Sequence, residues 1–148
     1  MGAREVGGAG VGTRDLVGGR GKGAVGGQTG ESIGLAIAEL NRGGYGLAAE
    51  TYLGKNVARL DAAEIAANRV GTSNDRKADA AVRFALTVAQ QRGHVSDDAV
   101  RAVKSAGFSD AEIIEIVVHV ALNTLTNYVN SVAQTEIDFP VVELRKAA

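Results

Sequence analysis

The chain has 148 residues, with 16 basic and 17 acidic side chains and a net charge of -1. This length suits one domain, and the balanced charge gives no overall field that would favour nucleic acid or an anionic membrane as a partner. The chain contains no cysteine, which excludes disulfides, thiolate nucleophiles and cysteine metal sites. With only two histidines, no long apolar window and no signal-like N-terminus, we expect no metal, no cofactor and a cytoplasmic location.

The N-terminal part is rich in glycine, since 13 of the 20 glycines fall within the first 34 residues. Each glycine raises the entropy cost of ordering the backbone, so we expect residues 1–28 to form a flexible arm before a helical domain at 29–148. The stretch "GKGAVG" formally matches GxGxxG, but no strand precedes it and no acidic partner follows it. Dinucleotide binding is therefore not expected.

Helical periodicity begins at Thr29. Ile33, Ile37 and Leu40 form one apolar stripe, and "LAAETYLGKN" predicts a second helix. In "LDAAEIAANRVG", Asp61 and Glu64 form a D-x-x-E capping pattern, and Gly71 is a plausible stop.

The next two predicted helices lie between residues 73 and 107. The first has Ser73 or Asn74 as its N-cap and ends at Gly93. The apolar residues that we expect to face inward from it are Ala78, Val82, Ala85, Leu86 and Ala89. A shorter helix, "SDDAVRAVKSAG", closes at Gly107.

The strongest helix signal is the stretch of about 26 residues from Ser109, "SDAEIIEIVVHVALNTLTNYVNSVAQ". Ser109 and Glu112 form a capping box. The expected buried stripe consists of Ile113, Ile116, Val117, Val120 and Ala121. Its length suggests a central helix or one shared with a partner subunit. Pro140 ends the helical region, strand signals are nearly absent, and the sequence predicts an all-α domain.

One short segment, "GGYGLAAE", places Gly43, Gly46 and Glu50 on one face of a predicted helix. Glycine disfavours a helix by about 1 kcal/mol relative to alanine, so two glycines in the first turn need an explanation.

Four blocks together resemble the AhpD-like alkylhydroperoxidases of the carboxymuconolactone decarboxylase family: "ETYLGKN", "LDAAEIAANRVGTSNDRKADAAVRFA", "RGHVSDDAV" and "FSDAEIIEIVVHVALNTLTNYVNSVAQTEIDFP". The resemblance runs from about Thr29 to Val142. It implies an all-helical subunit that forms a homo-oligomer, commonly a trimer or hexamer. It also implies relatives that act as antioxidant peroxidases, and a peroxide or a lactone as the ligand.

The peroxidases of this family carry a CxxC pair at a helix N-terminus, a histidine four residues later, and a glutamate on the preceding helix. On this sequence the resemblance places Gly43 and Gly46 at the two cysteine positions and Glu50 at the histidine position. It retains the glutamate as Glu31, and Tyr45 also fits the pattern around the missing pair.

Glycine supplies neither a nucleophile nor an electron pair, so the thiol reaction of the family cannot run on this polypeptide. The resemblance therefore implies a redox-inactive protein. Three explanations for the glycines remain open: a natural paralogue, deliberate inactivation, or a molecule that differs from the printed sequence at positions 43 and 46. In the last case the protein is an ordinary CxxC alkylhydroperoxidase.

On the family geometry, Glu31 and Glu50 face one another and could act as acid and base, as in the cysteine-free lactone decarboxylases. Two carboxyl groups in a partly buried site raise the pKa of one of them. The alternatives are a carboxylate-bound cation, or a Glu31 that only stabilises a helix N-terminus together with an exposed Glu50.

The last helix also carries a polar stripe, Glu115, His119 and Asn123, with Asn127 beyond it. Such a stripe could line a pocket together with Tyr45, or form a hydrogen-bonded seam between helices or subunits. We expect His94 to be exposed in a loop. Tyr45, Tyr52 and Tyr128 are expected to pack through their rings.

Overall fold

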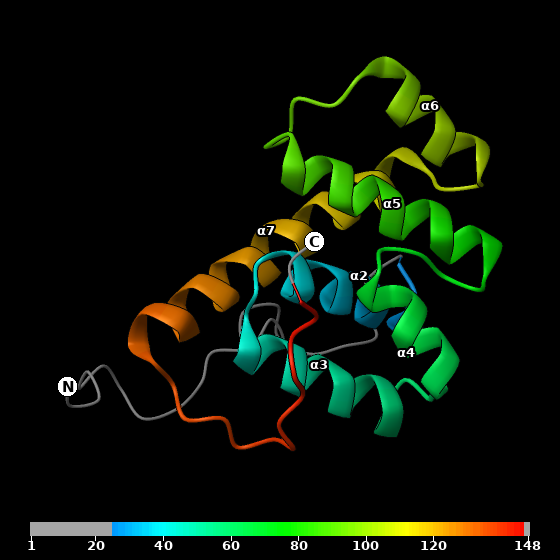
Figure 1. Ribbon diagram of the computed structural model, residues 1–148. Coiled ribbons are helices and arrows are strands. Elements are labelled where there is room, and N and C mark those ends of the chain that lie inside the picture. The colour runs from blue at the N-terminus through cyan, green and yellow to red at the C-terminus, as the bar shows by residue number, and fades with distance from the viewer. Residues whose placement is uncertain (1–24, 147–148) are drawn as a thin grey trace.

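The computed structural model describes residues 25–146, which form α-helices and no strand (Figure 1). The helices are α2 (Gly27–Leu40), α3 (Gly44–Asn56), α4 (Ala62–Arg69), α5 (Arg76–Gln90), α6 (Asp97–Ser105) and α7 (Asp110–Ala133). The all-α prediction is confirmed. Most of the expected glycine-rich arm lies outside the described residues, and residues 27 and 28 already belong to α2.

Helix α2 is the central element of the fold. Every residue from Glu31 to Glu39 is buried, and α2 contacts α3, α4, α5 and α7. A helix that is covered on all sides must be small or apolar almost throughout, and "SIGLAIA" meets this requirement. Of the two expectations for the long last helix, the central position belongs to α2, and the sharing of α7 with a partner subunit stays a prediction. Helix α7 packs on one side of α2 instead.

The sequence located most helix boundaries correctly. Asp61, Ser96 and Ser109 accept hydrogen bonds as N-caps, and Ser109 and Glu112 form both bonds of a capping box. The predicted cap of α5 is wrong, because Asp75 is the residue whose carboxylate accepts from the Ala78 N–H at 2.8 Å. Ser73 accepts from the Asp75 N–H instead and so supports the true cap.

Glycines end three of these segments at positions where other residues are strained. Gly71, Gly93 and Gly107 have φ angles of 85°, 84° and 106°. Only glycine adopts such angles at little cost, so the stops predicted from these three glycines are confirmed.

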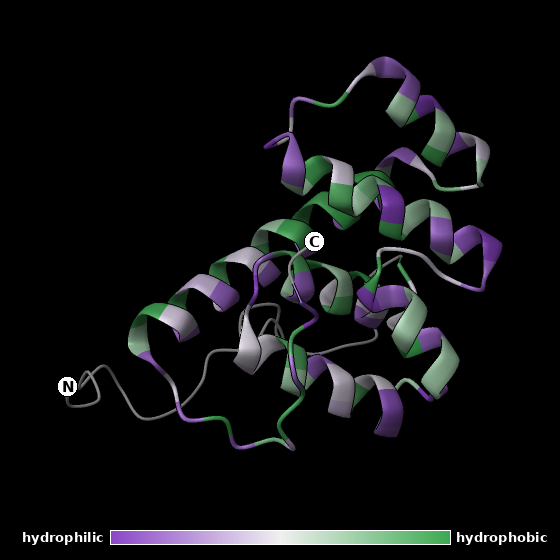
Figure 2. Ribbon diagram, in the orientation of Figure 1, coloured by the Kyte–Doolittle hydropathy of each residue, from purple (hydrophilic) through white to green (hydrophobic). Residues whose placement is uncertain are grey.

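Two hydrophobic clusters hold the helices together. The larger joins α2, α5, α6 and α7, and the smaller joins Leu35 and Ala38 of α2 to Leu47 and Leu60. Figure 2 shows hydrophobic ribbon segments where α5 and α7 run together, and hydrophilic turns on the outer side of α6. No helix in residues 25–146 is long and apolar enough to cross a bilayer.

The predicted inward faces are partly confirmed. On α5, Ala78, Val82 and Ala85 are buried, whereas Leu86 and Ala89 are half-buried. On α7 the first half is as predicted, with Ile113, Ile116 and Val120 buried and Val117 half-buried. Ala121 is exposed, because the buried face of α7 continues through Asn123 instead.

The segment after α7 returns across α3 and α2 (Figure 1). Its Phe139 ring packs against Tyr45 and Tyr52, with centroid distances of 5.9 and 5.6 Å. Further along, the buried carboxylate of Glu39 accepts from the Arg145 N–H at 2.6 Å and from Nε of Arg69 at 2.9 Å. These contacts hold the tail, residues 134–146, against α2 and α3.

Candidate functional site

Three helices bring the predicted site residues together. Gly43 is the N-cap of α3, and Gly46 and Glu50 follow within its first two turns. Both glycines lie against Asn127 of α7, and Glu50 lies against Gly34 of α2, one helical turn after Glu31. The resemblance placed Glu31, Gly43, Gly46 and Glu50 in one site. In the structure Gly43 and Gly46 lie at the contact of α3 with α7, Glu50 lies at the contact of α3 with α2, and Glu31 is buried on α2.

The space beside Gly43 and Gly46 is occupied by the Asn127 side chain. A Cβ atom at Gly43 would lie 3.0 Å from Cγ of Asn127, and one at Gly46 would clash with Nδ2 of the same residue. The backbone does not require glycine here, because Gly43 has φ -83° and Gly46 is not among the residues of positive φ. Glycine is needed at position 46 only because Asn127 fills the space.

Asn127 is only 3% exposed, and its position is fixed by a hydrogen bond. Nδ2 of Asn41 donates to Oδ1 of Asn127 at 3.1 Å and lies 3.3 Å from Oγ1 of Thr124. Nearby, Nδ2 of Asn123 donates to the His119 carbonyl at 2.8 Å. At Asn127 the polar stripe of α7 is hydrogen-bonded to the end of α2, whereas the bond of Asn123 stays within α7.

Glu31 and Glu50 are both buried, with exposed fractions of 1% and 9%. The interpretation of Glu50 as an exposed surface charge is therefore wrong. Glu31 also lies beyond the first turn of α2, which contains no acidic residue, so a role confined to the helix N-terminus does not fit.

Gly34 is the residue that lets Glu50 approach α2. A Cβ atom at Gly34 would lie 2.8 Å from Cδ of Glu50, closer than real Cβ contacts allow. The carboxyl group of Glu50 thus rests on the backbone of α2, where any other residue would displace it. A glycine within an otherwise apolar helix is the sequence signal for such a close approach.

His119 lies on the same helix face, nearer the start of α2. Its Nε2 is 3.8 Å from Oε1 of Glu115, and its ring would be 3.4 Å from a Cβ atom at Gly30. Oε2 of Glu115 accepts from the Val25 N–H at 3.1 Å. Among residues 25–146, no three histidine or acidic side chains lie close enough together to hold a metal ion.

The tyrosines divide into two groups. Tyr45 is half-buried and meets Phe139 edge to face, so it contacts the C-terminal tail. Tyr52 is 44% exposed although it touches Phe139, and Tyr128 is 58% exposed. The expectation that Tyr128 packs is therefore wrong within one chain, whereas His94 is exposed as expected.

These features define an all-helical protein with a buried polar site between α2, α3 and α7. No family model and no curated protein matches the chain. Its fold is similar to the crystal structure of an uncharacterized peroxidase-related protein from Silicibacter sp. TM1040, with a TM-score of 0.73 and 18% identity. The match covers 83% of this chain and 64% of the other, so this chain spans less than two thirds of that protein's length. The shared helical fold is the one that the AhpD-like resemblance implies.

Proposed function

We propose that this chain is an AhpD-like protein of the carboxymuconolactone decarboxylase family that has lost thiol peroxidase chemistry and keeps the helical scaffold. One observation carries the proposal: at the N-terminus of α3, positions 43 and 46 are glycine, and Asn127 fills the space beside them. A cysteine there would have its thiolate stabilised by the positive end of the helix dipole. The helix N-terminus remains, but the sulfur that it would activate is absent.

The experiment measures consumption of an alkyl hydroperoxide in the presence of a dithiol reductant. We expect the rate to equal that of buffer alone. Measurement of the intact mass comes first, because a cysteine in place of either glycine adds one CH₂S unit. A mass that matches the printed chain excludes the alternative of an ordinary CxxC peroxidase. Consumption of peroxide by a protein of the printed mass would contradict the proposal.

A gain-of-function variant tests whether the geometry is still suitable. The variant combines Gly43→Cys, Gly46→Cys and Glu50→His with Asn127→Ala, which removes the group that would clash at position 46. We expect dithiol-dependent peroxide reduction to appear. The matched control carries the same changes with glycine kept at position 46. Its lone cysteine cannot form an internal disulfide, so its sulfenic acid waits for the dithiol and the turnover should be slower than in the variant with both cysteines.

A second candidate is acid–base catalysis by Glu31 and Glu50, supported by the burial of both residues and by the position of the Glu50 carboxyl against Gly34, one helical turn after Glu31 on α2. Two carboxyl groups that share a poorly hydrated site do not both ionise readily, which supplies an acid and a base from one residue type. The ligand would be a carboxylated lactone, which loses carbon dioxide after proton transfer. Either Glu31→Gln or Glu50→Gln should lower lactone turnover by about 10²-fold or more. An unchanged rate in both variants would exclude this chemistry.

We further propose that the scaffold is a homo-oligomer, assembled through an apolar stripe on the exposed face of α7. The stripe consists of Ile114, Val118, Ala121, Leu125, Tyr128 and Val132, which recur at alternating spacings of four and three residues. This spacing suits helix-to-helix packing between copies. Between positions 116 and 135 the chain carries no aspartate, glutamate, lysine or arginine, so an uncharged second copy fits better than a charged partner.

A further inference from the structure

A groove between α5 and α6 lies apart from the site described above. Its volume is about 720 Å³, within the range of about 300–1,000 Å³ that is usual for small-molecule sites. All twelve lining residues come from α5, from α6 and from the first residue after α6. None of them belongs to α2, α3 or α7. The groove therefore requires its own explanation.

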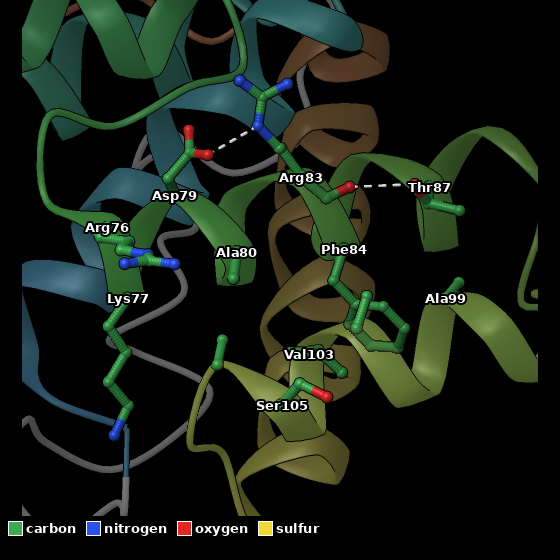
Figure 3. A pocket seen from close by; sticks show the side chains of 12 residues that line it. Arg76, Lys77, Asp79, Ala80, Arg83, Phe84, Thr87, Ala99, Val103 and Ser105 are labelled. Atoms are coloured by element: carbon green, nitrogen blue, oxygen red, sulfur yellow. Dashed lines mark hydrogen bonds and ion pairs between the residues drawn. The ribbon is translucent and has the colours of Figure 1, made fainter.

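The groove carries charged side chains at one end and mainly apolar ones at the other, where the Thr87 hydroxyl donates to the Arg83 carbonyl (Figure 3). Nζ of Lys77 lies 4.7 Å from the ring centroid of Phe108, so the start of α5 is beside the end of α6. Arg76, Lys77 and Ser105 line this end. Phe84 and Ala99 line the other end, and Figure 3 shows the Phe84 ring between the two helices.

The charge along the groove is positive, although the chain as a whole is slightly negative. Arg76, Lys77 and Arg83 line it, and Asp79 is its one acidic residue. Asp79 already accepts from Nε of Arg83 at 2.7 Å and from the Ser73 N–H at 2.9 Å. Burial raises the pKa of Asp79, but these hydrogen bonds outweigh it and lower the pKa, so the carboxylate stays ionised and satisfied. Arg76 and Lys77 form no ion pair with any residue in 25–146.

The groove has one short wall. Helix α6 has nine residues and is therefore about 13 Å long, which matches the length of a small linear ligand. Its wall is made of small residues, Ala99 and Ala102, over a floor of Phe84 and Val103 that is almost fully buried. A linear apolar chain can lie along such a wall, and each buried CH₂ group contributes about 0.8 kcal/mol.

We propose that this groove binds a medium-chain alkyl carboxylate. The carboxylate lies between Arg76 and Lys77, and the alkyl chain follows Ala102 towards Phe84. Charge complementarity selects the anion, and the apolar end selects the chain. Neither a short anion nor an uncharged chain of the same length satisfies both ends of the groove.

The test measures decanoate binding to the full chain by calorimetry, with amide chemical shifts to locate the site. We expect saturable binding and shifts confined to α5 and α6. Arg76→Gln combined with Lys77→Gln should weaken binding about tenfold, since two charge-assisted contacts are lost. Lys55→Gln, an exposed cation on α3, is the matched control and should bind as the wild type does.

Two further ligands and one further variant complete the experiment. Decanol and acetate should each bind at least tenfold more weakly than decanoate. Ala102→Phe, at an exposed position on α6, should block the groove without loss of helix content. The proposal is overturned if decanoate does not bind, if its shifts map to α7, or if acetate or decanol binds equally well.

Discussion

The two halves of α7 differ in which face they bury. The first half buries apolar side chains, as most helices of soluble proteins do, and these are Ile113, Ile116 and Val120. The second half shows the reverse: apart from Ala133, its buried residues are polar, namely Asn123, Thr126, Asn127 and Asn130, and its exposed ones include Leu125, Tyr128, Val129 and Val132. The first half packs against a hydrophobic core, whereas the second half reaches α3 at its glycines.

Both faces of the second half of α7 carry side chains that need a partner: the buried face carries amide groups and the exposed face carries apolar groups. Buried amide groups are costly unless they are hydrogen-bonded, and Asn41 supplies such a bond to Asn127. Exposed apolar side chains are stabilised only when another surface covers them. The second half of α7 therefore holds a polar site on one side and, in our proposal, a second copy of the chain on the other.

The largest expected effect on stability comes from a substitution in the first half of α7, which buries apolar side chains. Ile116→Ala should lower the free energy of unfolding by about 2–5 kcal/mol, because Ile116 is fully buried and its loss leaves a cavity. Ile114→Ala is the control: its side chain is 64% exposed, and in a monomeric background such as Leu125→Asp the change should stay within about 0.5 kcal/mol. Urea unfolding measures the free energy of unfolding of both variants. Equal losses would mean that Ile116 is not on the buried face of α7.

A charge on the exposed stripe should separate the copies. Leu125→Asp and Val132→Asp place carboxylates in the proposed interface, where they would be buried without a partner. Light scattering on a sizing column should show a monomer that keeps its helix content. Val57→Asp, on an exposed apolar residue at the end of α3, should leave the assembly intact. A wild-type protein that is monomeric at high concentration would refute the proposed interface.

The contact between Gly46 and Asn127 should show strong coupling. Gly46→Ala should cost about 1–3 kcal/mol through crowding, although alanine favours the helix. Asn127→Ala should cost about as much, since Asn41 loses its acceptor. The double variant should cost clearly less than the sum, as a double-mutant cycle would show. Gly27→Ala, where a Cβ atom meets nothing within 4 Å, is the control.

The smallest effect is a pH dependence at the start of α7. Hydrogen bonds from the Ser109 N–H and hydroxyl hold the pKa of Glu112 below its ordinary value of 4.5. The resulting stabilisation is present above the unfolded pKa and is lost as pH falls through the folded pKa. Ser109→Ala should lower the Tm slightly at neutral pH and reduce the drop in Tm on acidification below 4.5. An unchanged acid response in this variant would show that the cap does not act through Glu112.

Local chemistry in the sequence determined the helices and where they end. Side-chain caps such as Asp61 and Ser109, and glycine stops such as Gly71, act within a few residues, so their effect can be predicted without the fold. The sequence resemblance also named Glu31, Gly43, Gly46 and Glu50 as site positions. It could not show that Asn127 fills the space beside the glycines.

Only the tertiary structure decided which faces are buried. The reversed half of α7, the burial of Glu50 against Gly34, and the central place of α2 all depend on contacts between residues distant in sequence. A periodic pattern shows which residues share a face, but the neighbouring element determines whether that face meets a core, a polar site or solvent. In this protein the same helix meets a hydrophobic core along its first half and a buried polar site along its second.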